Sequence, residues 1–255
     1  MYADFAWESA PLSSWSAPAG ACVAYLLGVV VLRALVPAGG IKGLDLVLVA
    51  HNGCLSLLSA AMFLGCLWEL GAQIRGTKRV DWVFCEVPGE AKATGPLYFW
   101  SYIFYVSKYY EMVDTALAIL KGSTPPHFGL HVYHHALVPL FVWNWLEYRQ
   151  SLQFPGLLFN TFVHVIMYAY YALRVLKVPT PWKAWVTRVQ ILQFVTSVLL
   201  FCGTLRYMKG EYFGNRCAGT YCLWLNLAFN ITLLQQFVGV LFTPPRGPRK
   251  AQKLA

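Results

Sequence analysis

Long apolar stretches alternate with short polar or proline- and glycine-containing turns along nearly the whole chain. Each stretch is close to the roughly 20 residues that an α-helix needs to cross the hydrocarbon core of a bilayer. The pattern predicts seven transmembrane helices, at about residues 21–36, 44–70, 97–120, 130–145, 156–176, 185–205 and 221–242. A basic tail, residues 243–255, follows the last of them. We therefore expect one all-α integral membrane domain over residues 1–255.

The composition supports a membrane protein and argues against a nucleic-acid-binding one. Of the 255 residues, 58% are hydrophobic and 12% are charged, whereas a soluble domain carries about 25% charged residues. The net charge is +9, but the basic residues lie in short loops and in the tail. This distribution favours anchoring at a membrane surface, or an anionic ligand, over binding to nucleic acid.

The loops also predict an orientation and a disulfide. The side of the membrane that holds the C-terminal tail carries eleven Lys and Arg residues, and the opposite side carries eight. The positive-inside rule therefore predicts a cytosolic C-terminus and an N-terminus on the other side. Cys85 and Cys217 both fall in loops on that other side, where an oxidising compartment would allow them to pair. Cys222 is a competing partner, and free thiols are the third alternative.

Candidate chemistry is concentrated between residues 108 and 135. Four of the six histidines lie within residues 127–135, and three of them (His131, His134 and His135) share one helical face. Lys108, Glu111, Asp114 and Thr115 recur at helical spacing just upstream. A single buried histidine is commonly a packed core residue, and opposite charges can form a structural ion network. Three imidazoles beside this cluster instead indicate a reaction site, because ionisable groups inside a membrane are costly.

Later spans carry further polar side chains on their faces. Residues 156–176 hold Asn160, His164, Met167, Tyr168 and Tyr171, residues 185–205 hold Thr187, Gln190 and Gln193, and residues 221–242 hold Asn226, Asn230, Gln235 and Gln236. Each could form a hydrogen bond between helices. Together they predict a polar interior that includes acids, a lysine and several imidazoles.

At these residues the chain resembles the ELO fatty acid elongases. Four motifs of that family occur in order: Lys108-Tyr-Tyr-Glu111-Met-Val-Asp114-Thr115, His131-Val-Tyr-His134-His135, Asn160-Thr-Phe-Val-His164-Val-Ile-Met167-Tyr168-Ala-Tyr170-Tyr171, and Thr187-Arg-Val-Gln190-Ile-Leu-Gln193. They cover about 90 residues, and the hydropathy pattern extends the resemblance to nearly the whole chain. The tail departs from the family pattern, because Lys253 has no lysine two residues before it to complete a di-lysine retrieval signal.

The resemblance implies a fold, a reaction and a location. Spans two to seven would form a bundle around a narrow acyl tunnel, with span one outside. The reaction would condense a long-chain acyl-CoA with malonyl-CoA to a 3-ketoacyl-CoA, CO2 and CoA, the first and rate-setting step of elongation, with no cofactor and no metal. The protein would reside in the endoplasmic reticulum membrane with a lumenal N-terminus. Its partners would be the lipid bilayer, the other enzymes of the elongation cycle and a second copy in a homodimer.

The resemblance also implies roles for the motif residues. No cysteine lies in the motifs, so His134 would accept the acyl group, and His164 would bind or decarboxylate the malonyl unit. His131 and His135 would orient partners, Glu111 and Asp114 would fix imidazole tautomers, and Lys108 would balance the acids or stabilise an enolate. The expected substrate-binding residues are Asn160, Tyr168, Tyr171, Gln190 and Gln193, with Arg174, Lys177, Lys183 and Arg188 for the phosphates of CoA. Plain membrane anchoring is the alternative for these cations.

Two other classes of protein compete with this interpretation. Membrane di-iron desaturases and hydroxylases also contain His-x-x-His-His, and imidazole suits iron. Enzymes of that class have about eight ligand histidines in three boxes, whereas this chain has six histidines and one box. A transporter or seven-span receptor could use the buried charges as an ion relay but would not need the ordered motifs.

Within the elongase interpretation, the His-Val-Tyr-His-His-Ala form is more similar to elongases of polyunsaturated chains than to elongases of saturated ones.

Overall fold

The computed structural model describes residues 2–37, 39–89, 92–122, 128–214 and 216–242. In this part of the chain the regular secondary structure is helical, with one isolated β-bridge between Ala6 and Thr94. His127 and the tail 243–255 lie outside the described residues. The elements in order are a short 3-10 helix η1 (Trp7–Ser9), α1 (Ser16–Leu35), α2 (Asp45–Thr77), α3 (Asp81–Phe84), α4 (Gly95–Glu111), α5 (Val113–Leu120), α6 (Phe128–Glu147), α7 (Gln153–Val175), α8 (Lys183–Met208) and α9 (Thr220–Phe242).

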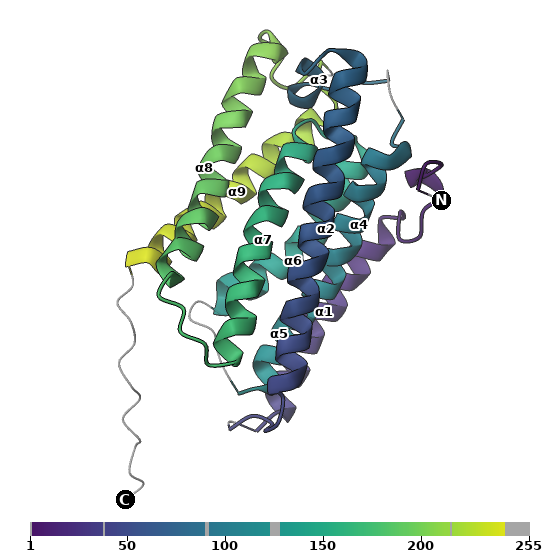
Figure 1. Cartoon of the computed structure of the whole chain (residues 1–255). Coiled ribbons are helices and arrows are strands. Elements are labelled where there is room, and N and C mark those ends of the chain that lie inside the picture. Colours follow the sequence, from purple (N-terminus) through teal and green to yellow (C-terminus); the bar gives the residue numbers. More distant parts are fainter. Residues whose placement is uncertain (1, 38, 90–91, 123–127, 215, 243–255) are drawn as a thin grey trace, which may run out of the picture.

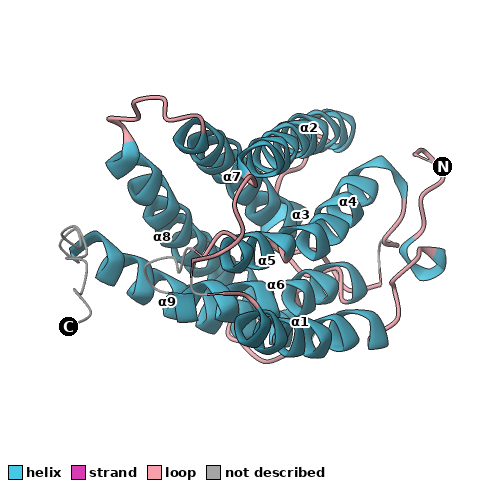
Figure 2. Cartoon of the chain, turned by 90° about the horizontal axis from the view of Figure 1, so that it is seen from below, coloured by secondary structure: helices cyan, strands magenta, loops and turns pink. Residues whose placement is uncertain are grey.

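Six of the long helices form a ring (Figures 1 and 2). Going round it, α2 packs against α7, α7 against α8, α8 against α9, α9 against α6, α6 against α4, and α4 against α2. Helix α1 packs outside the ring, against α5 and α6. The expected bundle with the first helix outside is therefore the observed arrangement. Close packing of α2 on α4 depends on Gly65, because any side chain there would overlap the ring of Trp100.

The burial pattern is that of a membrane-embedded protein. Lys108 and Glu111 are only 2% and 1% exposed, whereas Leu46 and Leu57 are 79% and 75% exposed. Polar groups thus face the inside of the bundle, and its outer surface offers leucine, valine and tryptophan side chains to lipid. Within the described residues, α1, α2, α7, α8 and α9 are long and apolar enough to cross a membrane.

The other two predicted spans differ from the simple pattern. The expected helix at about residues 97–120 is interrupted at Met112, so that α4 and α5 are separate elements. Helix α6 has the length to cross a bilayer, but its three histidines lower its hydropathy. The structure therefore supports five spans by length and composition, and the count of seven stays a prediction.

The loops at one end of the bundle are joined by a disulfide. Cys85 pairs with Cys217, the pairing expected from their loops, and Cys222 is a free thiol. Next to this bond, the backbone N–H of Ala218 donates to the carbonyl oxygen of Glu86 at 2.7 Å. The N-terminal segment covers the same end, where the indole Nε1 of Trp7 donates to Oε2 of Glu147 at 2.9 Å.

Glu86 itself is buried in this loop region. Tyr98 donates from its hydroxyl to both carboxylate oxygens, at 3.1 and 3.0 Å, and Nη1 of Arg149 lies 3.6 Å from Oε1. Burial raises the pKa of the Glu86 carboxyl above its ordinary value of 4.5, against the opposing effects of the Tyr98 hydrogen bond and the Arg149 charge. The two loops and α4 are therefore linked through a carboxyl group that is held away from water.

Candidate active site

Lys108 and Glu111 form the first of two buried polar networks inside the ring. One helical turn apart at the end of α4, they make an ion pair of 2.7 Å between Nζ and Oε1. Lys108 also donates to Oδ1 of Asn160 on α7 at 3.1 Å. Glu111 Oε1 lies 3.5 Å from Nδ1 of His164, one turn further along α7. The carboxylate therefore links the lysine of one motif to the histidine of another.

Asp114 is the centre of the second network. Its Oδ1 lies 2.5 Å from Nε2 of His51 on α2, and the hydroxyl of Tyr168 donates to its Oδ2 at 2.7 Å. Oδ2 also lies 3.9 Å from Nε2 of His135. The other ring nitrogen of His51 is 3.1 Å from the hydroxyl of Tyr110. The break at Met112 separates the two networks, so that Glu111 and Asp114 contact different imidazoles.

His51 was not among the residues expected to act in the site. It is 6% exposed and bonded at both ring nitrogens. In the sequence it is a single histidine in an apolar stretch, and its partner Asp114 lies 63 residues later. The available signal was an ionisable group in the middle of a predicted span, which marks a functional candidate in a membrane protein.

The histidine box places three imidazoles together on α6. The ring centroids of His131 and His135 are 4.4 Å apart, and those of His134 and His135 are 5.3 Å apart. Nε2 of His131 and Nδ1 of His134 are buried and have no hydrogen-bond partner among the described residues. Pro139 lies one turn after His135 within α6, and because proline has no N–H, the His135 carbonyl lacks its helical donor.

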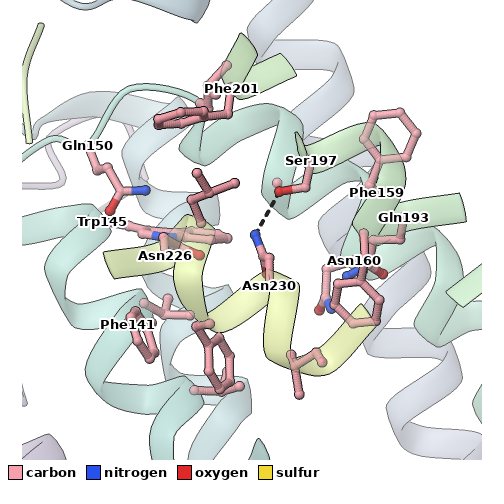
Figure 3. A pocket seen from close by; sticks show the side chains of 18 of the residues that line it. Phe141, Trp145, Gln150, Phe159, Asn160, Gln193, Ser197, Phe201, Asn226 and Asn230 are labelled. Atoms are coloured by element: carbon pink, nitrogen blue, oxygen red, sulfur yellow. Dashed lines mark hydrogen bonds between the residues drawn. The ribbon is translucent and has the colours of Figure 1, made fainter. Parts of the chain in front are cut away.

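A pocket of about 100 Å³ lies within the ring, between α6, α7, α8 and α9 (Figure 3). His134, Asn160 and Gln193 line one end of it, so three of the motifs meet there. On α6 the lining continues at regular helical spacing from His134 through Val138, Phe141, Val142 and Trp145. The pocket is therefore an elongated, largely apolar space that begins at the middle histidine of the box.

Several expected binding residues lie elsewhere. Gln190 donates to the sulfur of Met167 at 3.3 Å and is outside the pocket lining. Tyr171 is 41% exposed and packs edge-on against Tyr168. Its neighbour Tyr168 is buried and bonded to Asp114 rather than facing the pocket.

The expected CoA-binding cations do not line the pocket either. Arg174, Lys177, Lys183 and Arg188 are all exposed around the turn between α7 and α8. Arg188 lies over the ring of Trp185, with its guanidinium carbon 5.1 Å from the ring centroid. The structure thus gathers these four charges on one part of the surface, outside the pocket itself.

The donor set of the site differs from that of a metal centre. Among the described residues, no group of three or more His, Cys, Asp and Glu side chains is arranged to hold a metal ion. The carboxylates instead contact imidazoles, a lysine and tyrosine hydroxyls. This donor arrangement suits positioning of imidazoles better than the histidine-rich ligand set of a di-iron centre.

Fold and site together define a membrane-embedded helical protein with buried imidazole–carboxylate pairs and a largely apolar pocket lined by His134. Comparison with known proteins agrees: residues 10–243 match the sequence profile of the GNS1/SUR4 (ELO) family, and the chain belongs to that family.

Three relatives illustrate the similarity. The chain is 36% identical to fatty acid elongase sre1 of Dictyostelium discoideum over 205 residues, which are 78% of this chain and 74% of the relative. It is 34% identical to a putative fatty acid elongase of the same organism over 198 residues, 76% of this chain and 66% of the relative. It is 30% identical to very long chain fatty acid elongase 2 of Mus musculus over 211 residues, 79% of this chain and 65% of the relative.

Proposed function

We propose that this protein is a fatty acid elongase that condenses a long-chain acyl-CoA with malonyl-CoA. Membership of the ELO family and similarity to proteins named fatty acid elongases support this class of activity. The observation that carries the mechanism is the position of His134, which lines the apolar pocket while its Nδ1 has no hydrogen-bond partner among the described residues. Nothing described in the protein competes with a substrate for that nitrogen.

In the first half of the proposed reaction, a ring nitrogen of His134 attacks the thioester carbonyl of the acyl-CoA. The carbon–sulfur bond breaks, the CoA thiolate leaves and takes up a proton, and an acyl-imidazole remains on the enzyme. The acyl chain occupies the apolar pocket that begins at His134. The lining of this pocket within the described residues contains no cysteine, so the imidazole replaces the thiol that other condensing enzymes use.

In the second half, malonyl-CoA loses CO2, and the electron pair of the broken carbon–carbon bond forms an enolate. The enolate carbon attacks the acyl carbonyl, the bond to His134 breaks, and a 3-ketoacyl-CoA two carbons longer leaves. We assign the binding of the malonyl unit to His164, because it is buried and its Nδ1 lies 3.5 Å from Oε1 of Glu111. Glu111 accepts from Nδ1–H in this scheme and leaves Nε2 of His164 for the substrate.

The remaining polar residues act as positioning residues in this proposal. Lys108 is held between Glu111 and Asn160, which suits neutralisation of the acid better than direct contact with an enolate. Asp114 orients His135 and is itself held by His51 and Tyr168. His131 packs against His135 and His135 against His134, so both lie beside the middle histidine on α6 but outside the pocket lining.

We further propose seven transmembrane spans, with α4–α5 and α6 crossing the membrane beside the five apolar helices. The polar groups of α4 and α6 face the ring interior, so they need not meet lipid. The disulfide end would face the lumen of the endoplasmic reticulum, and the exposed cations of the α7–α8 turn would face cytosolic CoA. The same proposal includes polyunsaturated substrates, a homodimer, contacts with the other elongation enzymes and a reaction without a cofactor.

The test is an assay of labelled malonyl-CoA incorporation in membranes that contain the full chain, with saturated and polyunsaturated acyl-CoAs. The wild type is expected to form a 3-ketoacyl-CoA, and His134→Ala should lower the rate by at least about 10³-fold, because a covalent nucleophile is lost. Label on the protein with acyl-CoA alone that hydroxylamine releases, absent in His134→Ala, would identify the acyl-enzyme. Absence of malonyl incorporation by folded wild type with every acyl-CoA would refute the proposed function.

A further inference from the structure

The end of the pocket far from His134 is polar, although an acyl chain ends in a methyl group. Trp145 on α6, Gln150 after α6 and Asn226 on α9 line this end. Figure 3 shows the amide of Gln150 pointing toward the side chains of Trp145 and Asn226. Gln150 is 3% exposed and Asn226 is 7% exposed. These three side chains are here called the distal polar group. Gln150 and Asn226 are buried, and Nε1 of the half-buried Trp145 is itself shielded from bulk water.

Each member of the distal polar group has an unsatisfied hydrogen-bonding atom. Oε1 of Gln150, Nε1 of Trp145 and Nδ2 of Asn226 have no hydrogen-bond partner among the described residues. Other polar groups of the same pocket are satisfied within the protein: Asn230 donates to Ser197 at 2.7 Å, and Asn160 accepts from Lys108. Buried polar groups normally find partners, so a missing partner at three neighbouring positions indicates a ligand atom.

The three atoms match one chemical group. Gln150 offers an acceptor, and Trp145 and Asn226 offer two donors. A hydroxyl donates one hydrogen bond and accepts two, so it satisfies all three at once. A carboxylate would face the acceptor of Gln150 without a proton to donate, and a methyl group would leave all three unsatisfied. The backbone fixes the position of Gln150, whose N–H donates to the carbonyl of Trp145 at 3.0 Å while Gly219, with φ +68°, packs against its Cα.

From this arrangement we infer that the pocket takes acyl chains that carry a hydroxyl at or near the ω-end, with the distal polar group binding that hydroxyl. The inference rests on the proposed function only in taking an acyl chain as the ligand. His134 and Trp145 are eleven residues apart on α6, which corresponds to about 17 Å along the helix. An extended chain advances about 1.25 Å per carbon, given bonds of about 1.5 Å at about 111°. A hydroxyl that reaches the distal polar group is therefore attached about 13 carbons along the acyl chain from the reacting carbonyl.

The experiment compares ω-hydroxylated and methyl-terminated chains of equal length on the purified full-length protein in detergent. The first readout is the thermal unfolding temperature with free fatty acids of about 12 to 16 carbons, the range set by the helix spacing. The second is kcat/KM for the corresponding acyl-CoAs with malonyl-CoA. We expect the hydroxylated chain to stabilise the protein more than its methyl-terminated partner at the matching length, and to be elongated at least as well.

Two variants test the assignment of the residues. Gln150→Leu and, separately, Asn226→Leu should each lower the ratio of hydroxylated to methyl-terminated binding by roughly tenfold, the effect expected when a buried hydrogen bond is removed. Gln153→Leu is the matched control, because Gln153 is also buried and has an unpartnered Nε2, but lies outside the pocket lining. Its ratio should stay that of the wild type.

The outcomes separate this inference from the proposed function. If hydroxylated chains bind and no chain is elongated, the proposed function fails and the hydroxyl site stands. If methyl-terminated chains are elongated and hydroxylated chains bind no more tightly than them at any length, the distal polar group does not recognise a hydroxyl and the inference is overturned. It is also overturned if Gln153→Leu changes the ratio as much as Gln150→Leu does.

Discussion

The two ends of the pocket differ in where their buried polar groups find partners. Beside the histidine end, the acids and the lysine have partners within the protein: Glu111 contacts Lys108 and His164, and Asp114 contacts His51 and Tyr168. At the distal end, Oε1 of Gln150, Nε1 of Trp145 and Nδ2 of Asn226 have no hydrogen-bond partner among the described residues. The same contrast recurs on α6, where Nε2 of His131 and Nδ1 of His134 have no hydrogen-bond partner in the part of the chain that the structure describes.

The contrast follows from the cost of burial. An unpaired charge in a membrane interior costs far more than an unpaired amide or neutral imidazole. Charges must therefore be matched inside the protein before any substrate arrives, whereas neutral groups can wait for a ligand. A buried polar atom without a partner is thus more informative about substrate than a buried charge is.

The largest expected effect tests whether the charged end is held together by pairing. Glu111→Gln leaves Lys108 buried without a counter-charge, and we expect it to lower the free energy of unfolding by about 3 to 5 kcal/mol. Adding Lys108→Met to the same chain should recover most of this loss, because the uncompensated charge is removed. The unfolding temperatures in detergent of the wild type, Glu111→Gln, Lys108→Met and the double variant measure the coupling between the two residues. Equal destabilisation by the single and the double variant would contradict the pairing.

A smaller effect is expected from the histidine that the sequence did not reveal. His51→Ala removes the partner that holds Oδ1 of Asp114, and we expect kcat to fall about 10- to 100-fold, as for other residues that orient a catalytic side chain. His51→Asn keeps a donor toward Asp114 and should recover part of the rate. The measurement is kcat and KM for malonyl incorporation. A change confined to KM would place His51 in substrate binding instead.

The surface near the histidine end should matter for CoA rather than for chemistry. Reversing two exposed charges of the α7–α8 turn, Lys177→Glu with Lys183→Glu, should raise the KM for acyl-CoA roughly 3- to 10-fold at low salt and leave kcat nearly unchanged, since exposed charge pairs contribute modestly. Lys209→Glu, an exposed charge after α8 at the disulfide end of the bundle, is the matched control. An equal rise in KM for the control would show that the turn has no special role.

The smallest expected effect concerns Glu86 at the disulfide end. Because burial raises its pKa in the folded protein, the folded state binds this proton more tightly than the unfolded chain does. The stability that protonation provides is present below about pH 4.5 and is lost as pH rises through the raised pKa. Glu86→Gln cannot ionise, so its unfolding temperature should fall by about 2 to 4 °C less than that of the wild type between pH 4.5 and 7. Parallel pH profiles for the two proteins would contradict this linkage.

Much of the fold could be predicted from the sequence because a membrane leaves few alternatives to apolar helices. The predicted range 130–145 falls within α6, and 156–176 nearly coincides with α7. Helix α2 runs to Thr77, beyond the predicted end at residue 70, because its polar last turns extend past the apolar stretch. The break at Met112 was missed because the residues on both sides continue one apolar helical pattern.

The sequence predicts those parts of the site whose residues share a helix. It does not predict contacts between residues that are far apart in the sequence. His131, His134 and His135 had to lie together because their spacing is fixed by the helix. The pairing of His51 with Asp114 depends on how α2 packs against α5 and α7, which no local pattern contains. Gln150 was overlooked for a similar reason, since it lies in a turn and meets Asn226 only through the folding of α9 beside α6.

The arrangement of the ring has a consequence for synthesis in the membrane. Helix α2 packs most extensively against α7, yet roughly 80 residues separate the end of α2 from the start of α7. At about 5 to 20 residues per second, α2 waits about 4 to 16 s for its main neighbour to leave the ribosome. During that interval α2 and α4 meet lipid or an insertion factor on the side that α7 later covers. The ring therefore closes late, and the pocket is complete only after α9, the last helix, has entered the membrane.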